Sequence, residues 1–176
     1  MPRIDVRAQA QASPQQVWTV LADTASWTDW APFDEVAVEQ GHEVGEVRRL
    51  RSGRITTRER IVGFEPPRRY VYEIVSGLPI RDYVAEILLS PFAGDGTEVR
   101  WQAGFRAKIP GTGWVLKRLL EGAIRKGADA LVRRADGSCE SRLATDKGPA
   151  KLAGPRRHKG RHKGRPRPLG ELHGQT

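Results

Sequence analysis

Short, regularly spaced turns between residues 34 and 106 are the strongest constraint on the fold of this chain. Glycine, proline and serine gather at residues 41–45, 52–53, 63–67, 76–79 and 91–96. The segments between these turns are strand-sized, and the pattern predicts six of them. Gaps of two to seven residues suffice for hairpins but not for the crossovers that join parallel strands. We therefore expect an antiparallel meander.

Alternation defines a strand at each end of this region. Residues 3–9 place Ile4, Val6 and Ala8 on one face, which adds a seventh strand. The last strand is the clearest, because its apolar side chains alternate with polar residues or glycine and predict one buried face: Val99, Trp101, Ala103 and Phe105.

Two short helices are predicted between the first strand and the meander. Ser13 and Pro14 supply an N-cap and a first-turn proline for a helix over 14–22. Ser26 is expected to cap a second helix that carries Trp27 and Trp30, and Pro32 ends it.

Helical periodicity returns after Pro110 and predicts a long helix over 111–135. Its apolar stripe is expected to comprise Leu116, Leu120, Ala123, Gly127 and Leu131, flanked by Leu119, Ile124 and Val132. Together these elements predict an α+β fold, with a curled seven-stranded antiparallel sheet whose concave side holds the long helix. Space left in that trough is where a ligand cavity would form.

Several short motifs, taken together, carry a family resemblance over residues 2–136. They are Ser13-Pro14 before Val17-Trp18, Trp27 with Trp30-Ala31-Pro32, Val44-Gly45, Phe64-Glu65-Pro66-Pro67-Arg68, Gly77-Leu78-Pro79, and Gly96-Thr97 with Trp101. In their order and spacing they resemble the polyketide cyclase/dehydrase branch of the START-like SRPBCC superfamily. The resemblance implies a helix-grip fold, a curved sheet wrapped around a long C-terminal helix and enclosing a mostly hydrophobic cavity. Members include polyketide cyclases, lipid and sterol carriers and quinone-binding proteins, with no shared catalytic signature.

Strand parity nominates residues for the walls of this cavity. If Trp101 and Phe105 face the helix, the preceding strand points Tyr83, Ala85, Ile87 and Leu89 the same way. Tyr72, on another strand face with Tyr70 and Ile74, and Leu120 of the helix complete the candidates. Each of these side chains can be either plain core or ligand contact. Trp27 is expected to pin the crossing to the body, while Trp30 and Phe33 close the mouth of the cavity.

Glu59 is the charged residue with the most interesting position. It shares the odd positions of its strand with Ile55, Thr57 and Ile61, so it faces the cavity if those positions point inward. Burial would then raise its pKa and suit it to acid–base work. The alternatives are a polar ligand contact or a rim salt bridge with an arginine.

The common catalytic and cofactor motifs are missing from the sequence. His42 is the only histidine before residue 158, and it lies in an expected turn. There is no nucleophile elbow, phosphate-binding loop, dinucleotide fingerprint or zinc spacing, so the sequence indicates neither cofactor nor metal. No apolar stretch approaches the ~18 residues of a spanning helix. The N-terminus lacks a signal-peptide core and Cys139 is the single cysteine, which favours a reducing cytoplasm.

The positive charge is concentrated after residue 136. Residues 1–136 carry a net charge of +2 and residues 137–176 one of +7. This tail repeats the unit HKGR and has few large apolar side chains, so it is predicted to be disordered. It is either a solvated extension or an attachment to nucleic acid or to an anionic membrane, non-specific and sensitive to salt.

Two functions follow as hypotheses. The first is binding of a hydrophobic or amphipathic small molecule, lipid-, quinone- or polyketide-like, between sheet and helix. The second is an aromatase/cyclase acting on poly-β-keto chains, in which Glu59 or Tyr83 exchanges protons and converges with Arg49 in one pocket. The oligomeric state does not follow from the sequence.

Overall fold

The computed structural model describes residues 1–146, with side chains described as far as Ser138. The elements are β1 (Arg3–Ala10), α1 (Pro14–Ala22), the 3-10 turn η1 (Thr24–Ser26), α2 (Trp27–Trp30), β2 (Glu35–Gln40), β3 (Val47–Ser52), β4 (Ile55–Glu65), β5 (Arg69–Ser76), β6 (Ile80–Phe92), β7 (Gly96–Ala107) and α3 (Gly113–Asp146). The order predicted from the sequence is confirmed.

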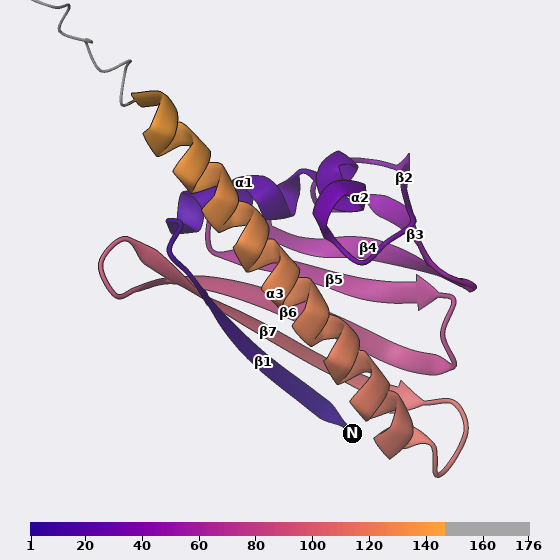
Figure 1. Ribbon diagram of the computed structural model, residues 1–176. Helices are drawn as coiled ribbons and strands as arrows, with labels where there is room; N and C mark the ends of the chain where they lie inside the picture. Colours follow the sequence, from indigo (N-terminus) through magenta and orange to yellow (C-terminus); the bar gives the residue numbers. More distant parts are fainter. Residues whose placement is uncertain (147–176) are drawn as a thin grey trace, which may run out of the picture.

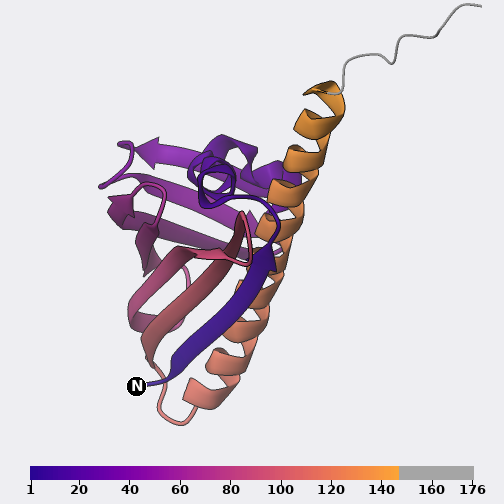
Figure 2. The same cartoon turned by 90° about the vertical axis from the view of Figure 1, so that its left-hand side faces the viewer.

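All seven strands form one antiparallel sheet in the order β1-β7-β6-β5-β4-β3-β2. Successive strands from β2 to β7 are hairpin neighbours, whereas β1 crosses over to pair with β7. The sheet is open, with β1 and β2 at its edges. Figure 1 shows α3 running diagonally across one face, and Figure 2 shows the sheet curving beside it. The predicted helix-grip arrangement is confirmed.

The two short helices begin differently. At α1 the Ser13 side chain accepts from the backbone N–H of Gln16, and the Gln16 side chain accepts from that of Ser13, so the predicted cap is confirmed as a capping box. The predicted cap at Ser26 is wrong. Its hydroxyl donates instead to the carbonyl of Asp23, because η1 already turns the chain and runs directly into α2.

The buried face of α3 is rotated slightly from the predicted stripe. Its centre is Ile124, Ala128, Leu131 and Ala135, whereas the predicted Ala123 is exposed. The small residues Gly127 and Ala128 let the helix approach β7 closely, since a Cβ at Gly127 would lie only 3.3 Å from the ring of Trp101. This contact sets the rotation of the helix. Leu116 and Leu120 are half-buried and pack against the core.

The C-terminal half of α3 is also fixed by a polar contact. One carboxylate oxygen of Asp136 accepts from the backbone N–H groups of Gln11 and Ala12, each at 2.9 Å. The helix was predicted to end near residue 135 but runs to Asp146. The rest of the predicted tail, including the HKGR repeat, lies outside the described residues. None of the described helices is long and apolar enough to cross a membrane.

Rows of ion pairs cover the convex face of the sheet. Glu35 and Glu39 of β2 accept from arginines of β3 and β4, and similar pairs join the other strands. Each exposed pair contributes little to stability. Together these charged side chains keep the convex face in contact with solvent, so the core forms on the concave face. The pairing of β2 with β3 shifts register between Val38 and Gln40.

Candidate functional site

The concave face of β6 and β7 carries the predicted row of inward side chains. Ala85 pairs with Ala103 and Ile87 with Trp101, so the two strands present one continuous wall. Tyr83, Trp101 and Phe105 are all buried in it. The parity predicted from the sequence is confirmed, whereas a ligand role for these residues remains a prediction.

A buried ion pair lies at the other end of this concave face. Arg48 of β3 stands opposite Glu59 of β4, and its Nε and Nη2 donate to one oxygen of Glu59 at 3.3 and 3.0 Å. Its Nη1 donates to the hydroxyl of Tyr70. The guanidinium lies 4.0 Å from the ring centroid of Trp27, within cation–π distance. A cation without solvent contact is therefore held by a carboxylate, a phenol and an indole ring.

The predicted inward position of Glu59 is confirmed, as is the predicted direction of its pKa. Burial raises the pKa of Glu59, and the neighbouring Arg48 opposes this shift without cancelling it. The residue is 8% exposed. The predicted alternative of a salt bridge at the rim is wrong in its location, because Glu59 pairs with Arg48 in the interior. A ligand contact or a proton-transfer role for Glu59 stays a prediction.

All three tyrosines of the chain line this interior. The hydroxyls of Tyr72 and Tyr83 are 3.5 Å apart, and the ring of Tyr72 meets that of Trp101 edge-on at 6.3 Å between centroids. Burial raises the pKa of Tyr70 to about 12, and burial likewise raises the pKa of Tyr72 and Tyr83. The negative charge of Glu59 contributes to each of these shifts, which places the carboxylate within electrostatic reach of all three phenols.

Trp101 contributes an unusual feature to the interior. It is 9% exposed, and its indole N–H has no hydrogen-bond partner among the described residues. Buried polar groups are nearly always paired, and an unpaired one costs about 1–3 kcal/mol. The ring that carries this donor meets Tyr72 edge-on and faces Gly127 with its benzo edge, and Trp101 pairs with Ile87 in the sheet.

Of the aromatic residues that follow α1, Trp27 is anchored as predicted, whereas closure of a cavity mouth by Trp30 and Phe33 stays a prediction. Trp27 is buried, and its indole N–H donates to the carbonyl of Leu21 at 3.1 Å, so it pins the crossing to the body. Trp30 and Phe33 are half-buried and pack on Trp27 at 5.8 and 6.0 Å between centroids. Half-buried apolar side chains thus border the core, and we call these the rim: Trp30, Phe33, Ile74, Leu78, Leu116 and Leu120.

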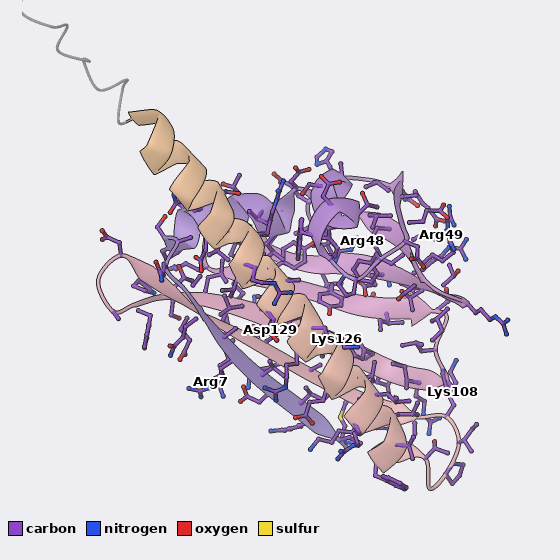
Figure 3. The ribbon with its side chains drawn as sticks, in the orientation of Figure 1. Arg7, Arg48, Arg49, Lys108, Lys126 and Asp129 are labelled. Carbon is purple, nitrogen blue, oxygen red and sulfur yellow. The ribbon has the colours of Figure 1, made fainter. Side chains whose placement is uncertain are left out.

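Arg48 is the site residue that the sequence analysis missed. The predicted convergence of Arg49 with Glu59 and Tyr83 is wrong, because Arg49 faces outward and pairs with Glu35 and Glu39 (Figure 3). The signal was present in the parity of the strand. Leu50 is buried, and a residue two positions away shares its face, which assigns Arg48 to the interior.

Two hollows of the described surface lie away from the expected cavity. One of about 460 Å³ is lined by Arg133, Arg134, Gly137 and Ser138, and one of about 70 Å³ by Gln16, Thr19, Val20 and Ser138. Neither lies between the sheet and the middle of α3. There the tyrosine and tryptophan rings pack on one another instead. A ligand in the trough therefore has to displace side chains.

Comparisons with known proteins agree with this fold. A profile of the family described as polyketide cyclase / dehydrase and lipid transport matches residues 1–136. Among solved structures, the XoxI protein from Bacillus cereus has 24% identity and a TM-score of 0.68, covering 76% of this chain and 95% of its own. A START superfamily protein from Mycobacterium smegmatis has 15% identity and a TM-score of 0.67, covering 77% of this chain and 98% of its own.

An enzyme is also among these structural relatives. The Zhui aromatase/cyclase from Streptomyces sp. R1128 has 18% identity and a TM-score of 0.66, covering 84% of this chain and 98% of its own. At such identities the likeness extends to the fold alone. A comparison with curated proteins finds no significant match.

Proposed function

Because the chain belongs to the polyketide cyclase / dehydrase and lipid transport family, we propose that it binds a hydrophobic or amphipathic small molecule between the sheet and α3. The ligand class is lipid-, quinone- or polyketide-like, an apolar body that carries an acceptor oxygen. The interior offers such a molecule aromatic and aliphatic surface from Tyr72, Tyr83, Trp101 and Phe105. Among the described residues, the interior also offers it the indole N–H of Trp101, a buried donor without a partner.

The unpaired N–H of Trp101 is the observation that carries this proposal. A carbonyl or phenol oxygen placed against Trp101 would accept that hydrogen bond and remove the cost of leaving the donor unpaired. The other polar groups of the interior are occupied already, since Arg48 and Glu59 pair with each other. The ligand is therefore oriented with its oxygen towards Trp101.

Access is proposed through the rim. Its side chains come from α2, the following loop, β5, the β5–β6 turn and the first half of α3, and they are only half-buried. Leu116 and Leu120 belong to the part of α3 that lies farthest from the Asp136 contact. Displacing the rim side chains opens the trough and leaves the Asp136 contact at the other end of α3 intact. Once the ligand is bound, Trp30 and Phe33 close over it.

Displacement of a fluorescent fatty acid, cis-parinaric acid, tests the proposal directly. Trp101→Phe keeps an aromatic ring but deletes the donor, so we expect the affinity for oxygen-bearing competitors to fall by about 5- to 30-fold, the equivalent of one hydrogen bond. Trp18→Phe is the matched control, because Trp18 is a buried tryptophan of α1 that packs on Phe64 and Tyr70. Native mass spectrometry of protein purified from its own host would detect a retained ligand.

The outcomes separate clearly. Probe binding that Trp101→Phe weakens and Trp18→Phe leaves unchanged supports a ligand held at Trp101. Equal affinities in all three proteins remove the role assigned to the indole N–H. Failure of the wild-type protein to bind the probe, together with a bare mass spectrum from the host, would overturn the proposed function.

A cyclase-type enzyme acting on poly-β-keto chains is the second candidate, and the grouping of Glu59 with two phenols favours it. Burial raises the pKa of Glu59, which suits it to proton exchange, and the hydroxyl of Tyr83 lies beside that of Tyr72. In this role Glu59 accepts the proton α to a carbonyl, and Tyr83 donates a hydrogen bond to the enolate oxygen. Turnover of a poly-β-keto analogue that survives both Glu59→Gln and Tyr83→Phe would refute these roles.

A further inference from the structure

The start of α3 presents an unusual group of exposed apolar side chains. Ile109, Trp114 and Leu119 are 56%, 73% and 65% exposed, and Val115 is also exposed. The remaining tryptophans, Trp18, Trp27, Trp30 and Trp101, are buried or half-buried. We call this group, with Ile109 in the loop before the helix, the α3 tip. Monomeric proteins seldom expose such groups without a partner.

The α3 tip lies on the solvent side of the helix. Val115 and Leu119 are one turn apart and therefore neighbours on one face. Leu116 and Leu120 of the same two turns pack against the core, so Val115 and Leu119 face away from it. The N-terminus lies beside the first turn (Figure 1), and Met1 is also exposed there. The apolar group is thus a projecting end of the molecule rather than part of a groove.

Cations surround the α3 tip. Lys108, Lys117 and Arg118 form no ion pair with any described residue, and Figure 3 shows Lys108 at the end of β7 beside the loop to α3. The nearby acids are already occupied, since Asp82 lies 3.6 Å from Arg106 and Glu121 lies 3.6 Å from Arg125. The local charge is therefore positive around an apolar centre.

We propose that the α3 tip docks on an anionic lipid bilayer, with Trp114 and Leu119 in the interface and the cations against the headgroups. Tryptophan and aliphatic side chains suit the boundary between headgroups and acyl chains, and flanking lysine or arginine suits the anionic headgroups themselves. Docking of two α3 tips on each other would instead bring Lys117 and Arg118 of one chain close to the same cations of the other, which repel them. Membrane docking by the α3 tip does not depend on the proposed ligand binding. Leu116 and Leu120 of the rim nevertheless lie on the same two turns of α3.

Sedimentation with vesicles of phosphatidylcholine and phosphatidylglycerol in equal parts tests the docking, using full-length chains so that the basic tail is common to all. We expect Trp114→Ser/Leu119→Ser to weaken binding at least about tenfold. The matched control is Phe92→Ser/Val44→Ser, which removes exposed apolar side chains elsewhere. Phe92 lies at the opposite end of the β6–β7 pairing from Ala107. The control should bind like the wild type.

Tryptophan quenching by brominated lipid supplies a second readout. Trp114 is the exposed tryptophan, so vesicles containing the brominated lipid should quench the wild-type protein and spare Trp114→Phe, although Trp114→Phe still sediments. That pattern supports insertion of Trp114. Binding unchanged in Trp114→Ser/Leu119→Ser would overturn the proposal and assign attachment to the tail. Absence of wild-type binding, or a wild-type dimer that the double variant abolishes, would overturn it too.

Discussion

The buried pair of Arg48 and Glu59 makes the sharpest prediction about stability. Arg48→Met removes the guanidinium and keeps most of the side-chain stem, which leaves the Glu59 carboxylate buried without its partner. Breaking a buried ion pair from one side costs about 3–5 kcal/mol. Domains of this size are stable by about 5–15 kcal/mol, so the variant should still fold.

Removing both charges should cost far less. In Arg48→Met/Glu59→Leu neither charge remains to be desolvated, and the hydroxyl of Tyr70 alone loses a partner. We expect a loss within about 2 kcal/mol of the wild type, much less than the sum of the two single losses. The difference from additivity measures the coupling between the two residues.

The dependence on pH fixes the sign of the effect. The pKa of Glu59 is already above the ordinary value of 4.5 in the folded wild type, and in Arg48→Met it rises further, because the effect of burial is no longer opposed. Below pH 4.5 the carboxyl of Glu59 is protonated in both the folded and the unfolded chain, so burying it carries no cost of desolvating a charge. The loss of stability grows as the pH rises towards the pKa that Glu59 has in the folded variant. The free energy of unfolding of Arg48→Met should therefore fall further below that of the wild type at about pH 8 than at about pH 5.

Urea unfolding followed by tryptophan fluorescence measures these losses. Arg49→Met is the control, since it removes the neighbouring arginine from an exposed pair with Glu35 and should cost less than about 1 kcal/mol. A loss below about 1 kcal/mol for Arg48→Met, or a double variant that loses the full sum, would show that the pair is not buried as described.

Three further changes test other contacts. Asp136→Ala should lower the stability by about 1–3 kcal/mol, because two backbone donors lose their acceptor, whereas Asp129→Ala at an exposed position of α3 should change it little in the same urea titration. Gly122→Ala should raise the melting temperature, since its Cβ meets nothing and the helix gains about 1 kcal/mol, while Gly127→Ala should lack that gain because its Cβ would lie 3.3 Å from Trp101. Absorbance at alkaline pH should show no tyrosine ionisation near the ordinary value of 10 until the chain unfolds, since the pKa of Tyr70 is about 12. The folded chain should lose stability as the pH rises from 10 towards 12, because tyrosine ionises first in the unfolded chain. Ionisation near pH 10 in the folded chain would contradict the burial of Tyr70.

The fold was predictable because its determinants are local. The capping box at Ser13, the turn residues and the alternation around Trp101 each act within a few residues. The order of strands followed from their short connections. Local signals were insufficient at Ser26 and at the end of α3, where a preceding 3-10 turn and a helix continuing to Asp146 decide the outcome.

The candidate site was predictable only in part, because its main interaction joins two strands. Parity placed Glu59 inward, but its partner depends on the pairing of β3 with β4 and on which face of β3 is buried. Adjacent arginines made that choice ambiguous until the burial of Leu50 was known. The missing partner of the Trp101 indole could not be inferred either, since it depends on every atom around the ring.

The carboxylates of β2 have a consequence for association between chains. An edge strand exposes backbone groups that can recruit another sheet, and charged side chains or a bulge counteract this tendency. Here Glu35 and Glu39 are engaged by arginines, and the register shift after Val38 interrupts the flat ladder. Fibril-like stacking along this edge is therefore disfavoured, and neutralising both glutamates would leave a short apolar strand open to aggregation.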